Sequence, residues 1–418
     1  MRLLTGIRAI LVSTLVLASL TSAVVLSKDA PSAKPEDVGL STERLARMDK
    51  FIHAYVDAGR TPGVVTLIAR HGKVVHVDAY GKADLASGRA TRTDDLFRMY
   101  SMTKPITSVA LLTLYEEGRF QLTDPLSKYF PVFANVKVMT GTSPSGGMLL
   151  DSPRRPITVQ DIFRHTAGFS YGFGGAPVDK MYQDANVFAT DLDGLVAKVV
   201  KMPLLYQPGE RWVYSVAHDV QAALVEKLSG QKFDQFVQQR VFTPLGMRDS
   251  VFKIPADKKS RVPGLYSMDK GKLVADTSPL GTGYGDQVFG GFSISTTASD
   301  YALFAQMLLN KGQLNGVRLL SPKTVELMAT NHLPPPALAS GPSPGTGYGL
   351  GVSVTMDPAA RGNLGSVGEF GWSGAASTHV LIDPKEDLVA IYCTQLMGGD
   401  FAIRAEFATL LYQSIVGN

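Results

Sequence analysis

The stretch that decides the fold is Ser101-Met102-Thr103-Lys104, followed directly by Pro105 and an apolar run over 106–115. Proline is tolerated in a first helical turn, and a run this apolar predicts a helix that is buried nearly all round. Residues three apart on a helix share a face, so we expect the amine of Lys104 to reach the hydroxyl of Ser101. A serine becomes a good nucleophile when a neighbour accepts its proton. The pair is therefore a candidate catalytic dyad.

The same S-x-x-K spacing recurs elsewhere in the chain, for example beginning at Ser229 and at Ser267. Ser101 differs because the N-terminus of its helix offers free backbone N–H groups and a favourable dipole for an oxyanion. Ser229 instead ends a helical pattern over 220–228 and precedes Gly230, a typical C-terminal stop. Ser267 lies in a polar, turn-like stretch. We interpret both as loop serines.

The N-terminal residues predict export. Arg2 and Arg8 precede an apolar run over 9–20 and the small residues of 21–23, so we expect residues 1–23 to be a signal peptide and the protein to be secreted or periplasmic. The alternative is an uncleaved anchor. The run is short for a membrane span, and no other segment predicts one.

Composition excludes several classes of function. The chain has 418 residues, 45% of them hydrophobic, and a net charge of +4, which falls by two without the leader's arginines. A large core in two lobes is expected, and nucleic acid is not an indicated partner. Cys393 is the only cysteine, which excludes an intramolecular disulfide and a cysteine-based metal cluster. The seven histidines lack metal-ligand spacing, and the glycines clustered in 281–285 and 345–351 complete no nucleotide-binding motif. We therefore predict no metal and no cofactor.

The pattern along the chain predicts an α+β fold in which an antiparallel sheet is flanked by N- and C-terminal helices. We expect residues 36–100 and 290–418 to form the sheet lobe and residues 101–289 to form an inserted, mainly helical lobe. Residues 139–156 and 171–177 are expected to be long polar loops. The expected strands are 64–69, 74–80, 291–295, 348–355, 379–382 and 388–394, and the expected outer helices are 42–58, 301–310 and 402–416.

Two further segments are candidates for chemistry. A turn over 207–210 precedes the strand-like residues 211–215, where Tyr214 is either a core aromatic or, beside the ammonium of Lys104, a group suited to take the serine proton. Gly371-Trp372-Ser373-Gly374-Ala375 precedes another strand-like run, and its glycines permit close approach of a substrate to a strand edge. The alternative for this segment is a bulge or turn with a packed tryptophan.

The three segments, in this order and spacing, resemble the serine β-lactamase and penicillin-binding-protein superfamily, and most closely its class C-like branch containing family VIII carboxylesterases. The likeness covers roughly residues 38–415 and includes 122–126, 164–169 and 383–385. It implies a β-lactamase/transpeptidase-like fold, a small-molecule ester or amide substrate and an acyl-enzyme. The oligomeric state stays open.

The resemblance also implies a role for each matched residue. Ser101 would be the acylated nucleophile, while Lys104 and Tyr214 would share the general-base work. The backbone N–H groups of Ser101 and Ala375 would form the oxyanion hole. The substrate-binding residues would be Trp372, Ser373 and Gly374.

Two departures favour an ester substrate. Penicillin-recognising members usually carry an asparagine two residues after the tyrosine, where this chain has Val216, and a cation where it has Trp372. Both changes remove polar anchors for penicillin-like or D-Ala-D-Ala-like substrates. The alternatives are a β-lactamase, a D-Ala-D-Ala carboxypeptidase-type peptidase or an acyltransferase using the same site. A catalytically silent binding or assembly protein is the non-enzyme alternative, although a scaffold has no need of a buried ammonium.

A competing nucleophile is Ser170, which lies in a G-x-S-x-G match over 168–172. The nucleophile elbow of α/β-hydrolases requires a strand before this motif and a helix after it. Here residues 158–163 predict a helix that begins with a capping box, and a glycine-rich loop follows the motif. We interpret Ser170 as a loop serine.

Overall fold

A seven-stranded antiparallel sheet joins the two ends of the chain. The computed structural model describes residues 33–278, 287–399 and 402–417, so the predicted signal peptide and the glycines of 281–285 lie outside the described residues. The strand order is β11-β12-β13-β14-β15-β1-β2. These strands are β1 (Gly63–Arg70), β2 (Lys73–Gly81), β11 (Thr346–Tyr348), β12 (Ser353–Thr355), β13 (Phe370–Ser373), β14 (His379–Asp383) and β15 (Leu388–Cys393).

The contact between β1 and β15 connects the N-terminal hairpin to the C-terminal strands, with Val65 opposite Cys393 and Arg70 opposite Leu388. A two-stranded hairpin is marginal alone, and pairing with β15 removes one of its free edges. The predicted antiparallel sheet made from both chain ends is confirmed.

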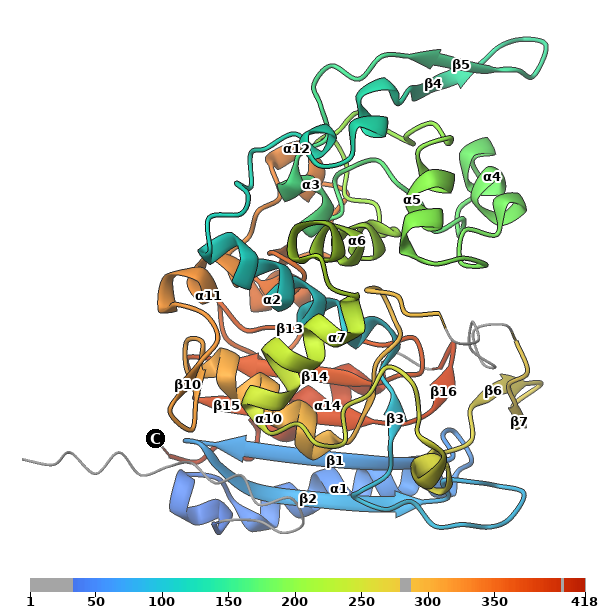
Figure 1. The fold of residues 1–418 in the computed structure, drawn as a ribbon. Coiled ribbons are helices and arrows are strands. Elements are labelled where there is room, and N and C mark those ends of the chain that lie inside the picture. The colour runs from blue at the N-terminus through green and yellow to red at the C-terminus, as the bar shows by residue number, and fades with distance from the viewer. Residues whose placement is uncertain (1–32, 279–286, 400–401, 418) are drawn as a thin grey trace, which may run out of the picture.

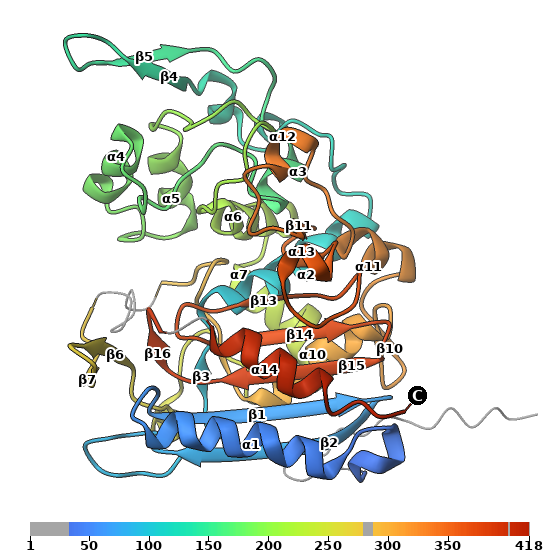
Figure 2. The same ribbon diagram turned by 180° about the vertical axis from the view of Figure 1, so that it is seen from behind.

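Helices cover both faces of this sheet. On one face lie α1 (Thr42–Asp57) and α14 (Ile403–Tyr412), which contact each other, and on the other lies α10 (Ala298–Leu309) (Figures 1 and 2). Alternation along β1 explains the two layers: Val64 and Ile68 pack in the cluster that contains α1, whereas Val65 and Leu67 pack in the cluster that contains α10. The strand is therefore buried on both faces.

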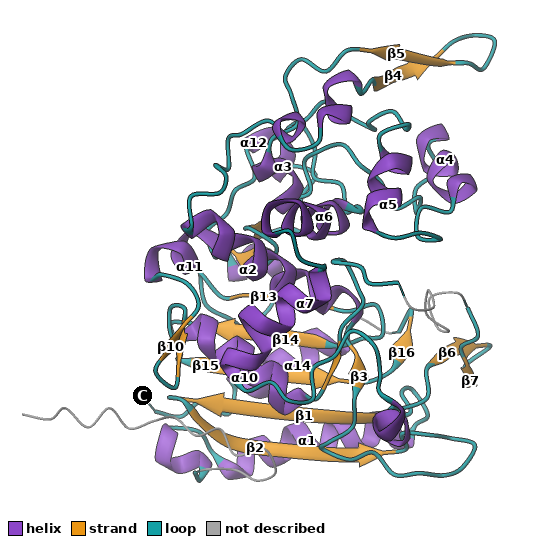
Figure 3. Cartoon of the chain, in the orientation of Figure 1, coloured by secondary structure: helices purple, strands orange, loops and turns teal. Residues whose placement is uncertain are grey.

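Above the sheet, helices predominate (Figure 3). The central helix is α2 (Thr103–Glu116), whose residues from Thr103 to Leu114 are all buried, and it packs against α6 (Ala217–Ser229). The other helices of this region are α3 (Val159–Phe163), α4 (Pro177–Ala185), α5 (Leu192–Val199), α7 (Phe233–Val237) and α8 (Thr243–Leu245). The predicted burial of the helix after Ser101 is confirmed, and the residue limits of the two lobes stay predictions.

Short elements complete the described chain. The small strands are β3 (Phe97–Arg98) with β8 (Ser295–Thr296), β4 (Val138–Thr142) with β5 (Met148–Asp151), β6 (Tyr266–Asp269) with β7 (Lys272–Ala275) and β16 (Leu396–Met397), and β9 (Gln313–Leu314) with β10 (Val317–Arg318). The short helices are α11 (Pro322–Met328), α12 (Pro335–Leu338) and α13 (Pro358–Arg361), together with a π-turn over Gln238–Phe242 and 3₁₀ turns over Pro35–Val38, Tyr100–Met102, Leu126–Lys128, Pro131–Asn135 and Ala256–Arg261. Within the described ranges, no helix combines the length and apolar character that crossing a membrane requires.

Local sequence signals mark several helix ends. The side chain of Ser41 accepts a hydrogen bond from the backbone of Arg44 at the start of α1. Thr158 and Asp161 form the predicted capping box of α3. Gly230, with a φ of 73°, ends α6.

Several strand and loop predictions are wrong. The predicted polar loop over 139–156 contains the β4–β5 hairpin, whose strands pair with each other and project from the helical region (Figure 1). Residues 211–215 form no strand, because no neighbouring strand pairs with them and local propensity is not enough.

The C-terminal elements are also shorter than predicted. The expected strand over 348–355 divides into β11 and β12 around Gly351, whose positive φ turns the chain, and a Cβ there would lie 2.1 Å from Ser108 Oγ. Of the strand expected over 291–295, only Ser295 lies in β8. The helix expected over 402–416 ends at Tyr412.

Candidate active site

Ser101 lies in the 3₁₀ turn that leads directly into α2. The turn begins at Tyr100, whose φ of 45° is strained for a residue with a side chain. The chain after β13 closes over this turn, because a Cβ on Gly374 would lie 2.3 Å from Met99 O. Thr378 Oγ1 also donates a hydrogen bond to Met99 O (3.3 Å). Gly374 is therefore required for the third motif to approach the candidate nucleophile.

Lys104 reaches Ser101 as the helical spacing predicts. Its Nζ donates to Ser101 Oγ at 3.1 Å and to the carbonyl oxygen of Gly291 at 2.9 Å. The side chain is 1% exposed, and Nζ lies 4.6 Å from the centre of the Tyr214 ring. A buried amine in contact with a hydroxyl is suited to exchange a proton with it.

Tyr214 completes the cluster from a distant part of the chain. Its Oη donates to Ser101 Oγ at 2.6 Å. The ring packs 4.8 Å from the His165 ring and 5.7 Å from the Trp372 ring, centre to centre. The structure thus brings Ser101, Lys104 and Tyr214 together around one oxygen atom, and loss of a proton from Lys104 or Tyr214 would let that group accept the serine proton.

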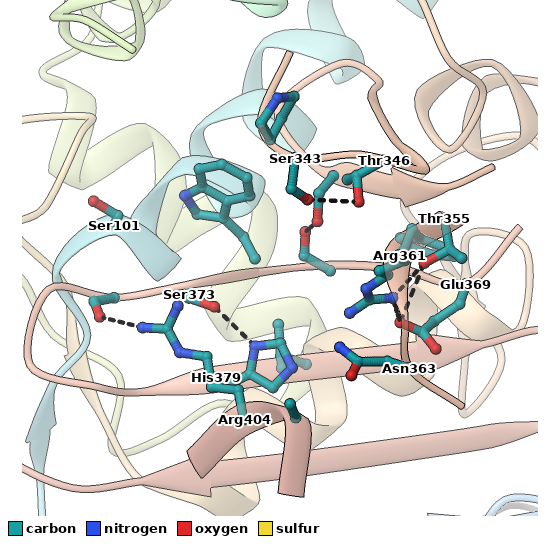
Figure 4. Close-up of a pocket in the computed structure, with 18 of the residues that line it drawn as sticks. Ser101, Ser343, Thr346, Thr355, Arg361, Asn363, Glu369, Ser373, His379 and Arg404 are labelled. Atoms are coloured by element: carbon teal, nitrogen blue, oxygen red, sulfur yellow. Dashed lines mark hydrogen bonds and ion pairs between the residues drawn. The ribbon is translucent and has the colours of Figure 1, made fainter. Parts of the chain in front are cut away.

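The third motif lies beside this cluster. Trp372 and Ser373 end β13, and Gly374 and Ala375 follow the strand. Ser373 Oγ is 2.8 Å from His379 Nδ1, and Arg404 donates to Gly374 O at 3.3 Å. Figure 4 shows Ser101, Ser373, His379 and Arg404 around one cavity. Ser101 and Ala375, the two residues expected to supply oxyanion-hole N–H groups, line the cavities described next.

Ser101 stands where two cavities of different chemistry meet. One, of about 400 Å³, has several charged and hydroxyl side chains in its mixed lining and is called the polar cavity here; the other, of about 250 Å³, is mainly aromatic. Ser101, Tyr214 and Ala375 line both. The polar cavity is also lined by Trp372, Ser373, Gly374, Thr346, Arg361 and Glu369, and the aromatic one by Tyr100, Tyr171, Phe173, Val187, Phe188 and Phe292. The aromatic residues were not singled out in the sequence, where they are spread over nearly 200 positions.

Three titratable side chains near Lys104 are fully buried: His165, His218 and Asp219. Burial raises the pKa of Asp219 to about 6, while the charge of Lys104 opposes that rise. Burial lowers the pKa of His165 and His218 well below the usual range, so both imidazoles are neutral. His165 Nδ1 lies 3.3 Å from Ser215 Oγ, which is 50 positions away in the chain. His379 is a cavity wall, and burial lowers its pKa to about 3.

The alternative serines have other contacts. Ser170 is buried, donates to Asp179 and accepts from the backbone of Gly172. Ser229 donates to Val225 O at 2.7 Å. Ser267 lies on β6 and not in a turn, since 266–269 pairs with β7. Among residues 33–278, 287–399 and 402–417, no group of three His, Cys, Asp or Glu side chains is arranged to hold a metal ion.

Comparison with known proteins places this chain in a family. The model of the Beta-lactamase family matches residues 48–413. The chain belongs to the Beta-lactamase family. Protein Rv1367c of Mycobacterium tuberculosis is 35% identical over 356 residues, covering 82% of this chain and 88% of that protein. Lovastatin esterase of Penicillium rubens is 31% identical over 377 residues, covering 83% and 92%. The solved structure of unliganded simvastatin synthase (LovD) from Aspergillus terreus matches with a TM-score of 0.77 at 23% identity, covering 90% and 100%.

The Beta-lactamase family comprises serine hydrolases and acyltransferases with this α+β fold, so the fold expected from the resemblance is confirmed. Val216 lies two residues after Tyr214, where penicillin-recognising members usually carry an asparagine. It is fully buried at the start of α6, and its backbone N–H donates to Ser170 O. The side chain therefore offers no polar contact to a substrate.

Proposed function

We propose that this Beta-lactamase family protein is a serine esterase that acts through an acyl-enzyme on Ser101. The observation that carries the proposal is the placement of one partly exposed serine oxygen within 3.1 Å of Lys104 Nζ and 2.6 Å of Tyr214 Oη, at the junction of two cavities. An exported location remains part of the proposal and rests on residues 1–23 alone.

In the first half-reaction, Ser101 Oγ attacks the ester carbonyl carbon while its proton passes to the Lys104–Tyr214 pair. The oxyanion is stabilised by the N–H groups of Ser101 and Ala375. When the tetrahedral intermediate collapses, the bond to the alcohol oxygen breaks, and the alcohol takes the proton back from the pair. Water then repeats these steps in the second half-reaction and releases the acid.

The substrate class follows from what the site lacks. With Val216 and Trp372 in place of an amide and a cation, a β-lactam or peptide would lose two polar contacts, each worth about 1.5–3 kcal/mol where charge is involved. An apolar ester needs neither contact. The relative named lovastatin esterase supports the same class.

We expect p-nitrophenyl esters to be turned over with a kcat/KM at least ~100-fold above that for a chromogenic cephalosporin or a D-Ala-D-Ala peptide, the ratio that two lost contacts imply. The measurement is a panel of esters of increasing chain length beside these two substrates. Turnover of the cephalosporin or the peptide alone would overturn the ester assignment.

The aromatic cavity is proposed to hold the acyl group. A cavity of roughly 150 Å³ accommodates benzene, so 250 Å³ suits acyl chains of about four to eight carbons. Phe188→Ala enlarges this cavity and is expected to raise kcat/KM for a decanoate ester at least ~5-fold relative to butyrate. Phe51→Ala, the same change on α1 far from the site, is the matched control and should leave the chain-length profile unchanged. An unchanged profile in Phe188→Ala would place the acyl group elsewhere.

A further inference from the structure

Lys104 and Asp219 are two buried side chains of opposite charge that bind the backbone of the same residue, Gly291. Lys104 Nζ donates to the carbonyl oxygen of Gly291 (2.9 Å), and the N–H of the same Gly291 donates to Asp219 Oδ1 (2.8 Å). Lys104 is 1% exposed and Asp219 is fully buried. The two charges are therefore connected through the two ends of a single residue.

The packing at position 291 is too close for a side chain unless Tyr171 or Asp219 moves. A Cβ there would lie 3.0 Å from both carboxylate oxygens of Asp219 and 2.8 Å from Tyr171 Oη. The backbone of Gly291 therefore approaches the carboxylate at a distance that a side chain would prevent. The second carboxylate oxygen, Oδ2, has no hydrogen-bond partner among the residues that the structure describes.

A buried ammonium is costly unless a negative charge compensates it. Within the described ranges, no carboxylate lies at ion-pair distance from Lys104. Asp219 is a buried carboxyl group on which the charge of Lys104 acts, and the interaction is mutual. The other titratable groups facing the pair are the phenols of Tyr171 and Tyr214, and the imidazoles of His165 and His218, which burial keeps neutral.

We propose that Asp219, acting through the backbone of Gly291, is a positioning residue for Lys104: it orients the Gly291 carbonyl toward Nζ and supplies a negative charge that favours the ammonium. The inference rests on the proposed function of Lys104 in proton transfer. Asp219 touches neither Ser101 nor the cavities, and it was not identified from the sequence. Its local signal is weak, because an aspartate in the first turn of α6 is also typical of a partner of the helix dipole.

The test is the pH dependence of Ser101 labelling by a fluorophosphonate in wild type and Asp219→Asn. Asparagine keeps the shape and one acceptor oxygen but removes the charge, so the ammonium is destabilised. One limb of the plot of labelling rate against pH depends on the protonation of Lys104. Whether this is the acidic or the alkaline limb, it is expected to move to lower pH by about one unit or more. Asp300→Asn, the same change at a buried aspartate that accepts from the backbone of Asp249, is the matched control, and its profile should coincide with wild type.

A second measurement does not depend on activity or on the folding of an Asp219 variant. The infrared carboxylic-acid band of Asp219 is followed against pH in wild type and in Lys104→Met, where a flexible apolar side chain replaces the amine. Because the Lys104 charge favours the carboxylate, its removal should extend the protonated form of Asp219 to higher pH.

The two possible failures are distinct. If wild type is not labelled on Ser101, the proposed function is wrong. If wild type is labelled but the Asp219→Asn profile coincides with it or moves to higher pH, Asp219 does not act on Lys104. An Asp219 titration midpoint that is the same in wild type and Lys104→Met would equally overturn the inference.

Discussion

Replacement of Ser101 by alanine is expected to abolish turnover of every ester, with kcat falling by about 10⁴- to 10⁶-fold. The variant lacks the oxygen atom that both Lys104 and Tyr214 contact within 3.1 Å, so no covalent intermediate is expected to form. Steady-state assays measure the loss, and mass spectrometry of the fluorophosphonate-treated protein measures the missing adduct. The stability of the variant should stay close to that of wild type, because the side chain is small and partly exposed.

The matched control is Ser170→Ala, which removes the hydroxyl of the competing motif. Ser170 Oγ is hydrogen-bonded to Asp179 and Gly172 in the interior, so this change is expected to cost stability, about 1–2 kcal/mol, while leaving the adduct in place. An adduct mapped to Ser170, or near-normal turnover by Ser101→Ala, would refute the assignment of the nucleophile.

Tyr214→Phe is expected to lower kcat/KM by about 10²- to 10⁴-fold, the usual range for loss of a general acid or base. The substitution removes only Oη and its 2.6 Å contact with Ser101, while the ring keeps its packing against His165 and Trp372. Ester hydrolysis and the rate of fluorophosphonate labelling should fall together, because both need the serine proton to be removed.

Tyr348→Phe provides the matched control for that loss. Tyr348 is fully buried, and its Oη has no hydrogen-bond partner among the described residues, so removing the oxygen should leave kcat/KM within about 2-fold of wild type. Equal rates for Tyr214→Phe and Tyr348→Phe would assign all proton transfer to Lys104 and remove Tyr214 from the mechanism.

Features that depend on neighbours in the chain could be predicted. Lys104 contacts Ser101 because three residues of helix bring them to one face, and α2 is buried because its sequence is apolar all round. The hairpin of β1 and β2 and the caps at Ser41, Thr158 and Gly230 also follow local rules. Tyr214 and the third motif could not be assigned in this way. Their own segments left their roles ambiguous, and only the resemblance to a known family connected them with Ser101.

Tertiary packing decided the rest. Tyr214 is 113 positions from Ser101, and the Gly291 carbonyl is 187 positions from Lys104, so no periodicity in the sequence relates them. The strand predicted over 211–215 is absent because a strand needs a partner that local propensity does not provide. The two cavities and the Asp219–Gly291–Lys104 connection arise where distant segments pack against α2. In this protein the sequence alone determined the contact between Ser101 and Lys104 and the buried helix that follows Ser101, because both depend on short-range geometry. The fold decided which groups surround Ser101, because burial and charge compensation depend on residues far apart in the chain.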